Sequence, residues 1–280
     1  MTILHDNTIA FIGAGNMAHS LISGLIAHQY PPKHIIASDP TKEKCEFIEQ
    51  EFGIQCFTKN LDAIKRAQII ILAVKPYHLK SVLEEIQAIV HTNKPLIISI
   101  AAGISIEKIT HWLSLPEKSE IAIVRCMPNV AAFVQSGATG MYANSHVKSL
   151  QRDLAENIMR AVGLTLWVEN ENMINVVTAV SGAGPAYFFL IMEAMEKTAH
   201  ELGLSLEDAR LLIAQTALGA AHFALSTDES VAELRARVTS KGGTTEKAIS
   251  ILEHYKIREA FDSALKAAYE RAVEIANTES

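Results

Sequence analysis

The sequence has few cysteines, few aromatic residues and no concentration of positive charge. Its three cysteines, Cys45, Cys56 and Cys126, show neither Cys-x-x-Cys nor Cys/His spacing, so we expect buried thiols in a reducing compartment and no metal site. Lys and Arg number 25 and are scattered along a chain of net charge -6, which excludes a groove for nucleic acid. The first residues lack the basic start and apolar core of an export signal, so we expect a cytoplasmic protein.

One stretch, from Asn172 to Met192, lacks charge altogether and has about the length that crosses a bilayer. Its content excludes that role, because Asn175, Thr178 and the Gly-Ala-Gly-Pro break at 182–185 would leave polar groups unsatisfied in lipid. Lys and Arg do not cluster on either flank. We therefore expect no membrane contact, and a helix that is buried at a domain or subunit interface.

What is present is the composition of a globular protein. Hydrophobic residues make up 49% and charged residues 20%, which is enough to build a sizeable core, and 280 residues favour about two domains. Strand and helix patterns alternate up to Thr165–Val168, and only helical periodicity follows. The predicted fold is an α/β N-terminal Rossmann domain over residues 1–166, with a doubly wound, mainly parallel sheet, and an all-α C-terminal dimerisation domain over 167–280.

The chain opens with an apolar run, Thr8 to Ile12, then turns at Gly13-Ala14-Gly15 and continues as a helix from Asn16. A dinucleotide site requires this order. The first glycine permits the tight turn, the second lets the backbone approach the pyrophosphate, and the helix N-terminus offers free N–H groups. Ala18 takes the place of the third glycine. We predict that a nicotinamide dinucleotide binds here.

Further strands are expected at residues 34–38, 68–74, 96–100 and 121–125, with a helix over 41–52. Parallel sheets bind ligands at the carboxyl ends of their strands. The loops at 73–76, 101–103 and 127–129 should therefore lie near the cofactor, although Lys75 is given no role in proton transfer. The residues expected to contact the cofactor are Gly13, Ala14, Gly15, Asn16, Met17, Ala18, Ser38, Asp39, Asn60, Ala73, Val74, Lys75, Pro76, Ala101 and Gly103.

Asp39 lies about twenty residues beyond the glycine loop, where an acidic residue accepts hydrogen bonds from the adenine-ribose hydroxyls. Taken alone, it favours NADH. Ser38, Thr41 and Lys42 lie near the same place and could hold a 2′-phosphate. A simple turn role for Asp39 before Pro40 competes with both interpretations. The cofactor choice stays open, with NADP(H) favoured and NAD(H) the alternative.

The second half is predicted to be helical throughout, over residues 183–202, 205–225, 230–237, 244–254 and 257–277. Several of these helices are apolar on more than one face, for example at 211–214 and 217–221, which is too hydrophobic for the surface of a monomer. We therefore expect a homodimer.

A polar loop interrupts these helices at Val238-Thr239-Ser240-Lys241-Gly242-Gly243-Thr244-Thr245. Such a turn, leading directly into a helix, can present several N–H groups to an anion. An ordinary helix-to-helix turn with a threonine cap is the simpler interpretation. The loop has more hydroxyls than one cap needs, however, and the N-terminal domain supplies a cofactor site without a substrate site.

The chain resembles the pyrroline-5-carboxylate reductases along essentially its whole length. Five motifs carry the resemblance, and the last two are the most specific. They are Phe11–Ala18, Ala73–Pro76, Arg125–Asn129, Ser181–Tyr187 and Val238–Thr245. The chain departs from the family pattern at Lys241, where proline is commoner, and at Ala236, where many members have aspartate.

The resemblance implies reduction of 1-pyrroline-5-carboxylate to L-proline by NAD(P)H, the last step of proline biosynthesis. It also implies interlocked dimers, often joined as a pentamer of dimers. The substrate carboxylate would rest on the backbone at Gly243 and Thr244, with Thr245 at the ring nitrogen, Ser240 nearby as a second catalytic candidate, and Glu171 near the substrate. No metal is implied.

Three alternatives remain. A β-hydroxyacid dehydrogenase would resemble a family with a catalytic lysine in the interdomain helix, and this chain has no lysine between Lys148 and Lys197. A non-catalytic NAD(P)H sensor would leave the loop from Ser240 to Thr245 without a role. A related cyclic imine acid as substrate would be decided by the size of the pocket.

Overall fold

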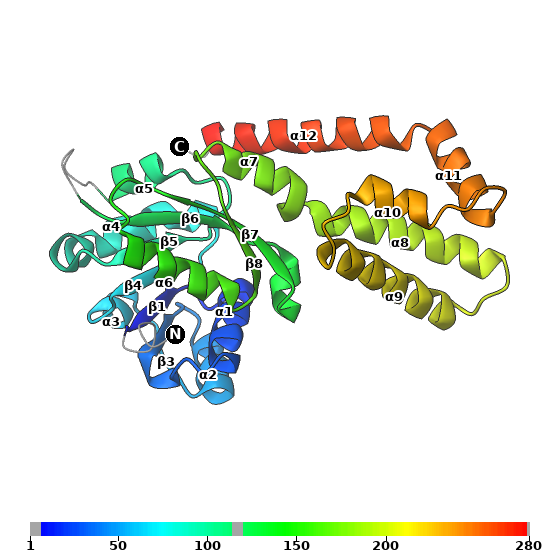
Figure 1. The fold of residues 1–280 in the computed structure, drawn as a ribbon. Coiled ribbons are helices and arrows are strands. Elements are labelled where there is room, and N and C mark those ends of the chain that lie inside the picture. The colour runs from blue at the N-terminus through cyan, green and yellow to red at the C-terminus, as the bar shows by residue number, and fades with distance from the viewer. Residues whose placement is uncertain (1–6, 114–119, 279–280) are drawn as a thin grey trace. The chain divides into compact units, whose positions relative to one another are not determined.

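The computed structural model describes residues 7–113 and 120–278 (Figure 1). The first six residues, which are expected to carry no export signal, lie outside this part of the chain. Contacts divide the chain into two compact units, one made of Met1–Ala183 with Ala268–Ser280 and the other of Gly184–Ala267. The predicted division at residues 166 and 167 falls before the last residue of the last strand, β8 (Gly163–Trp167), and stays a prediction.

The first unit is built on one sheet of eight strands in the order β3-β2-β1-β4-β5-β6-β7-β8. All neighbouring strands are parallel except β6 and β7, which confirms the predicted doubly wound, mainly parallel sheet. Besides β8, the strands are β1 (Ile9–Ile12), β2 (Ile35–Ser38), β3 (Gln55–Phe57), β4 (Ile69–Leu72), β5 (Leu96–Ser99), β6 (Ile123–Met127) and β7 (Gly137–Ala143).

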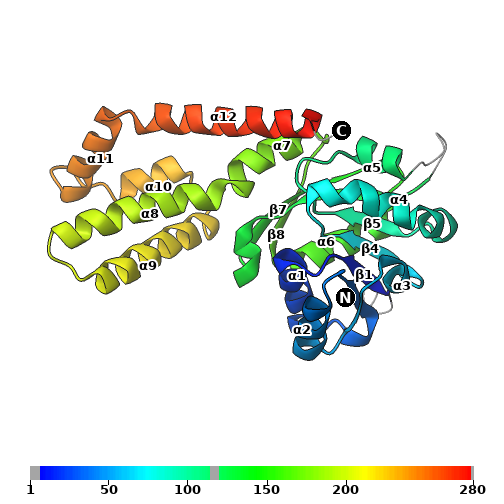
Figure 2. The same ribbon diagram turned by 180° about the vertical axis from the view of Figure 1, so that it is seen from behind.

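Strands β1 and β4 are apolar throughout, as expected where both faces of the sheet are covered. Alternate residues of β1 enter separate cores, Ile9 and Phe11 on one face and Ala10 and Ile12 on the other. The first core is closed by α1 (Asn16–Ala27), α2 (Lys42–Phe52) and α6 (Ser149–Arg160). The second is closed by α3 (Asn60–Ile64), α4 (Pro76–Asn93) and α5 (Ile106–Trp112). Figure 2 shows this second group from behind.

The antiparallel strand β7 was not predicted. Its sequence, GATGMYA, has no apolar run, and its glycines serve close packing. A Cβ at Gly140 would lie 2.6 Å from Cγ1 of Val177, and one at Gly137 would lie 2.9 Å from the carbonyl oxygen of Val162. The first unit also contains four shorter helical elements. They are the 3-10 helices η1 (Pro32–His34) and η2 (Val130–Val134), helix α7 (Met173–Val177) and a π-helix, η3 (Thr178–Gly182).

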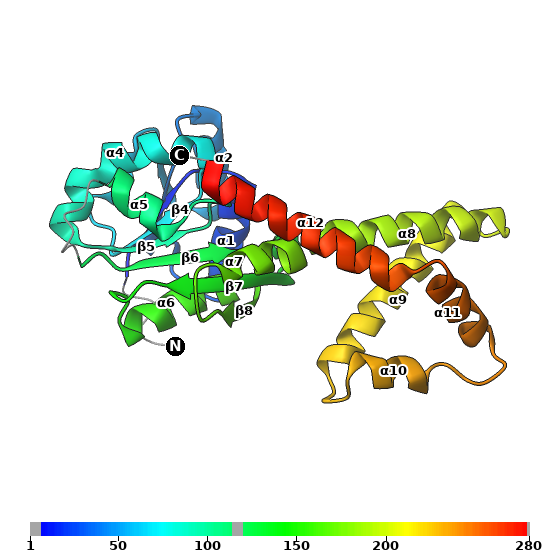
Figure 3. The same cartoon turned by 90° about the horizontal axis from the view of Figure 1, so that it is seen from above.

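The second unit is all helical, and its helices begin and end within two residues of the predicted bounds. They are α8 (Gly184–Glu201), α9 (Leu206–Leu225), α10 (Val231–Arg237), α11 (Thr244–His254) and the first half of α12 (Ile257–Thr278) (Figure 3). Ser205 and Ser230 cap α9 and α10, each accepting a hydrogen bond from an N–H in the first turn. Because these caps are local to the sequence, both helix starts could be predicted correctly.

Large apolar side chains remain exposed in the second unit of this single chain. Phe188, Phe189 and Leu190 on α8 are 62–65% exposed, and Leu211 on α9 is 68% exposed. Among the described residues, one helical stretch, Met173–Glu201, is long and apolar enough to cross a membrane by length and composition. Only 22% of its most apolar window is buried within the chain. Side chains of this kind require a cover that one chain does not provide.

Candidate functional site

The predicted glycine turn connects β1 to α1, and its first position can hold only glycine. Gly13 has φ +100°, and a Cβ there would lie 2.7 Å from the carbonyl oxygen of Ala73. Its N–H donates to the carbonyl oxygen of Ser38 at 2.7 Å, while the N–H of Ala73 donates to Ile12 at 2.8 Å. Gly13 is therefore held between the ends of β2 and β4, where no side chain fits.

The second glycine is placed differently. Gly15 is the N-cap of α1 with φ -82°, which any residue adopts, and a Cβ there would meet nothing within 4 Å. The first bond along α1 runs from His19 N–H to the Gly15 carbonyl oxygen at 2.9 Å, and the first turn contains no acidic residue. The N–H groups of Asn16, Met17 and Ala18 precede that bond and suit an anion. The open space at Gly15 fits a pyrophosphate lying close to the backbone.

Asp39 connects this loop to the end of β2. One carboxylate oxygen accepts a hydrogen bond from the N–H of Ala14 at 3.2 Å and contacts Lys44 Nζ at 3.3 Å, and the other accepts from the N–H of Thr41 at 3.0 Å. Burial alone would raise the pKa of Asp39, but the hydrogen bonds from Thr41 and Ala14 and the Lys44 ammonium outweigh it and lower that pKa. Asp39 is thus an ionised clamp between two loops.

Ser38 and Asn60 lie beneath the same surface. Ser38 is fully buried, and its hydroxyl donates to Asn60 Oδ1 at 2.8 Å. The Asn60 amide in turn donates to Glu85 at 2.7 Å. Thr41 and Lys42, which follow Asp39 closely in the chain, are exposed to solvent. Of the groups expected near a 2′-phosphate, these two are the accessible ones.

The carboxyl ends of β4 and β5 carry the next predicted residues. Ala73 and Val74 lie against the glycine turn, exposed Lys75 is the N-cap of α4, and Pro76 is its first residue. Pro suits that position because its missing N–H would be unpaired there.

The loop after β5 packs against the end of α12. Ala101 is buried, and its N–H donates to Ser99 Oγ at 3.4 Å. Gly103 has φ +78°, and a Cβ there would lie 2.6 Å from Cγ2 of Ile275. The Nζ of Lys108 also donates to the carbonyl oxygen of Ala276 at 2.8 Å. The loop at 101–103 is therefore anchored by the last turns of the chain.

The carboxyl end of β6 meets the π-helix η3. Asn129 is buried, and it donates from Nδ2 to the carbonyl oxygen of Ser181 at 2.9 Å while its Oδ1 accepts from the N–H of Ala138 at 3.2 Å. A Cβ at Gly182 would lie 2.9 Å from Cε of Met127. Two of the motifs are thus in contact, at an irregular turn of a type often found at functional sites. Asn129 was not among the predicted site residues, although it lies in one of the expected loops.

Glu171, predicted to lie near the substrate, has structural partners. Its Oε1 accepts from Arg125 at 2.9 Å and from the N–H of Ile106 at 2.8 Å. The Arg125 side chain is only 5% exposed and that of Glu171 is 23% exposed. Glu171 thus compensates a buried guanidinium on β6 and holds the first residue of α5.

The predicted polar loop lies in the second unit, between α10 and α11. Gly242 has φ +76°, and its N–H donates to Glu246 Oε2 at 2.7 Å. Gly243 is the N-cap of α11, and a Cβ there would lie 2.9 Å from Ser240 Oγ. The first helical bond runs from Lys247 to Gly243 at 3.3 Å.

Thr244 and Thr245 therefore stand in the first turn of α11, where N–H groups have no helical partner. The Thr244 side chain is exposed and Thr245 is half-buried. An anion can be held here by backbone N–H groups, with hydroxyls beside it. Ser240 lies against Gly243, and Thr244 and Thr245 follow directly in the chain.

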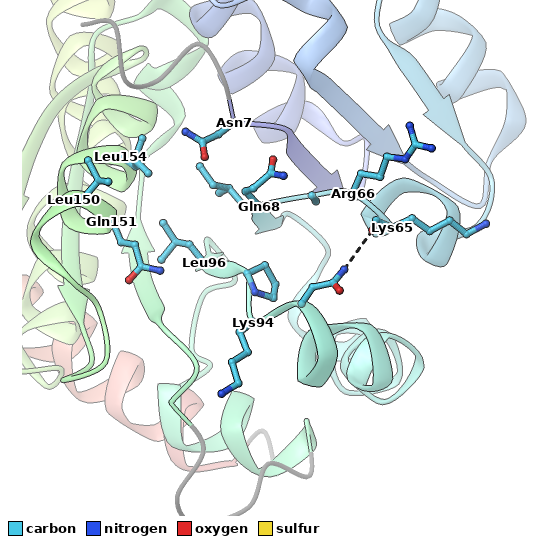
Figure 4. A pocket seen from close by; sticks show the side chains of 13 residues that line it. Asn7, Lys65, Arg66, Gln68, Lys94, Leu96, Leu150, Gln151 and Leu154 are labelled. Carbon is cyan, nitrogen blue, oxygen red and sulfur yellow. Dashed lines mark hydrogen bonds between the residues drawn. The ribbon is translucent and has the colours of Figure 1, made fainter.

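A hollow of about 720 Å³ lies elsewhere, at the amino ends of β4 and β5 (Figure 4). It is lined by Lys65, Arg66 and Lys94, and the carbonyl oxygen of Lys65 accepts from Asn93 Nδ2 at 3.3 Å. This edge of the sheet is opposite to the glycine turn, so the hollow is not part of the candidate site. Within residues 7–113 and 120–278, no three His, Cys, Asp or Glu side chains gather to hold a metal ion.

Two family models match separate parts of the chain. A model for pyrroline-5-carboxylate reductase dimerisation matches residues 171–275, and one described as NADP oxidoreductase, coenzyme F420-dependent, matches residues 8–103. The dimerisation match includes α8 and α9, whose large apolar side chains are exposed in the single chain.

Whole-chain similarity is high. A pyrroline-5-carboxylate reductase of Pseudomonas aeruginosa is 47% identical over 270 residues, covering 96% of each chain. The structure of a reductase of the same name from Coxiella burnetii has a TM-score of 0.91 at 46% identity, covering 96% of this chain and 98% of that one. A pyrroline carboxylate reductase of Plasmodium falciparum, with NADP bound, has a TM-score of 0.85 at 26% identity, covering 98% of this chain and 99% of that one.

Proposed function

The chain belongs to the pyrroline-5-carboxylate reductases, and on that premise we propose how its residues reduce 1-pyrroline-5-carboxylate to L-proline, the last step of proline biosynthesis. When bound, the reduced nicotinamide supplies the hydride. The observation that carries the proposal is the pair of helix N-termini, α1 at Gly15 and α11 at Gly243, whose first N–H groups have no helical partner. One suits a pyrophosphate and the other a carboxylate.

The cofactor is held by the first unit. The N–H groups of Asn16, Met17 and Ala18 receive the pyrophosphate. The rest of the dinucleotide contacts the loops after β4 and β5, at Ala73 to Pro76, Ala101 and Gly103. NADP(H) is favoured over NAD(H) because the Asp39 carboxylate is already engaged by Ala14, Thr41 and Lys44. The exposed Thr41 hydroxyl can then meet a 2′-phosphate, and so can the Lys42 ammonium on leaving its exposed ion pair with Glu46 at 3.0 Å.

The substrate is held by the second unit's loop. Backbone N–H groups at Thr244 and Thr245 receive the carboxylate, and the hydroxyl of Thr245 hydrogen-bonds the ring nitrogen as it changes from imine to amine. Protonation of that nitrogen makes the imine carbon electrophilic, so no strong base or metal is needed. Ser240 supports the loop through Gly243 and is the second hydroxyl available to the substrate. Rate enhancement then rests on holding the reacting carbons in register.

Glu171 contributes by position. Its contact with Arg125 and Ile106 holds β6 and α5 in place, which keeps Met127 and Asn129 at the carboxyl edge of the sheet. Glu171 therefore acts on the substrate site through β6 and α5 and not by direct contact.

The assembly is proposed to be a homodimer joined through the helical unit, with five dimers forming a decamer. The exposed apolar faces of α8 and α9 support the dimer. We further propose a cytoplasmic enzyme without membrane or nucleic-acid partners, in keeping with its net charge of -6. Light scattering of the purified protein would distinguish dimer from decamer.

The test is the rate of NADPH and NADH oxidation with racemic 1-pyrroline-5-carboxylate, with proline identified as the product. Thr245→Ala should lower kcat/KM about ten- to a hundredfold, the value of one hydrogen bond to a charged group. Thr245→Ser keeps the hydroxyl and should retain most activity, while NADPH binding should be unchanged in both variants. Equal loss in the Ser and Ala variants would contradict the role of the hydroxyl, and cofactor binding without turnover in the unmodified chain would point to a sensor.

A further inference from the structure

Two of the three cysteines, separate in the sequence, meet in the fold. Cys45 lies in the first turns of α2 and Cys56 on the neighbouring edge strand β3 (Figures 1 and 2). Both are free thiols, and their Sγ atoms are 2.6 Å apart. The chain passes from α2 into β3 through Gly53, which has φ +66° and ends the helix, and this turn brings the two side chains together.

The pair lies directly under the loop that is proposed to hold the adenosine end of the cofactor. The Sγ of Cys45 is 3.4 Å from the carbonyl oxygen of Asp39 and 3.5 Å from that of Phe57. The N–H of Asp39 donates to the same Phe57 oxygen at 3.1 Å, and the N–H of Cys45 donates to Thr41 at 3.3 Å. Any change at the sulfur atoms is therefore one contact away from Asp39 and Thr41.

The two thiols differ in access. Cys45 is 4% exposed, whereas Cys56 is half-buried at the edge of the sheet. Disulfide-bonded cysteines in cytosolic proteins are usually transient and act as sensors of oxidants. An accessible thiol with a second thiol in contact provides the geometry for such a reaction, in which the thiolate is the reactive form.

We propose that Cys45 and Cys56 form a reversible disulfide within the chain when it meets a peroxide, and that this modification weakens binding of the dinucleotide. The second part rests on the proposed cofactor site. The Cys56 sulfur attacks one peroxide oxygen and the O–O bond breaks. Cys56 becomes a sulfenic acid, and the other oxygen departs as water. Cys45 sulfur then attacks the Cys56 sulfur, the S–O bond breaks and a second water leaves. Two thiols are oxidised, and one hydrogen peroxide is reduced to two waters.

Oxidation would act on the loop in two ways. It removes the thiol hydrogen that Cys45 presents to the Asp39 carbonyl oxygen, and it replaces the hydrogen bond from Cys56 to Cys45 by a covalent bond of about 2.05 Å. The disulfide then links the start of α2 covalently to β3, and the backbone from Asp39 to Lys44 must shift with it. We expect the KM for NADPH to rise about fivefold, in the lower range of couplings between linked sites, while the KM for the imine stays the same.

The rate of oxidation should depend on pH. Burial, the hydrogen bond to Cys45 and the nearby carboxylates of Glu49 and Asp39 raise the pKa of Cys56, so the thiol persists at neutral pH. Since the thiolate is the nucleophile, oxidation should accelerate as pH rises. Brief exposure to dilute peroxide near neutrality should therefore leave the pair largely reduced.

The experiment treats the purified full chain with hydrogen peroxide at pH 8, blocks the remaining thiols and maps peptides by mass spectrometry without reduction. A peptide pair linked through Cys45 and Cys56, lighter by two hydrogen atoms and released by dithiothreitol, is expected. Its absence at saturating peroxide would overturn the proposal. Cys56→Ser should give no linked pair and no change in KM on oxidation. Cys126→Ala is the matched control, because Cys126 is buried on β6, and it should behave like the unmodified chain.

The KM for NADPH is measured on the same oxidised sample. A linked pair with an unchanged KM would overturn the effect on the cofactor and leave the disulfide. If the chain did not reduce the imine at all, the proposed function would fail, while peptide mapping and NADPH fluorescence titration would still decide this proposal.

Discussion

The two glycines of the first turn offer a test that separates folding from binding. Gly13 and Gly15 are two residues apart, yet only Gly13 has a backbone conformation and surroundings that reject a side chain. Alanine at Gly13 should destabilise the fold. Alanine at Gly15 should leave the fold intact and obstruct the cofactor.

The size of each effect can be worked out from the structure. At Gly13 the positive φ costs a non-glycine residue about 1–2 kcal/mol. The contact at 2.7 Å is with the backbone oxygen of Ala73, which cannot rotate away, so crowding adds about 1–3 kcal/mol. The free energy of unfolding should thus fall by about 2–5 kcal/mol. At Gly15 the added methyl meets nothing, and loss of chain entropy in the unfolded state should stabilise the protein by about 0.4–1 kcal/mol.

The assay combines urea unfolding with titration of NADPH fluorescence. Gly15→Ala should keep the unfolding midpoint of the unmodified chain or exceed it, and its Kd for NADPH should rise at least about tenfold, or ~1.4 kcal/mol. Gly13→Ala should unfold at markedly lower urea. Tight NADPH binding by Gly15→Ala would refute the assignment of this space to the pyrophosphate, and an unchanged midpoint for Gly13→Ala would refute the packing argument.

Three further predictions concern carboxylates. Glu171→Gln leaves the buried Arg125 guanidinium without its counter-charge and should lower the free energy of unfolding by about 1–3 kcal/mol in urea titrations. The loss is smaller than for a fully buried pair because Glu171 is partly exposed. An unchanged unfolding midpoint would contradict a stabilising role for the Glu171–Arg125 ion pair. The lowered pKa of Asp39 means that its stabilisation is present above about pH 4 and is lost as pH falls through the folded value, so acid titration should show less loss of stability in Asp39→Asn than in the unmodified chain. Glu246→Ala frees the N–H of Gly242 and loosens the loop before α11, so the KM for the imine should rise several-fold while thermal unfolding is little changed; an unchanged KM would show that the loop keeps its shape without Glu246.

The parallel strands and the helices of the second unit could be predicted because each has a local cause. Ile69–Leu72 is apolar at every position, as a strand buried on both faces must be, and Ser205 and Ser230 mark helix starts by their own hydrogen bonds. The glycine turn was predictable for the same reason. A positive φ at Gly13 and a capping position at Gly15 are properties of a few consecutive residues.

The features that the sequence did not reveal depend on residues far apart in the chain. Glu171 meets Arg125 across 46 positions, and Asp39 reaches Ala14 across 25. Strand β7 is held by partners on both sides, and its own residues have little strand propensity. The hydroxyl of Ser38 looked available for a phosphate, but the fold places it beneath the surface against Asn60. Only tertiary structure decides which polar groups are already satisfied.

The course of α12 has a consequence for how the protein is made. The chain leaves the first unit at Ala183 and returns to it at Ala268, where Ile275 and Ala276 contact Gly103 and Lys108. A ribosome therefore releases the whole helical unit before it supplies the last piece of the Rossmann domain. The nascent chain must keep the surface that α12 contacts open until residues 268–278 have been synthesised. The first unit can therefore be completed only after the whole helical unit has been made.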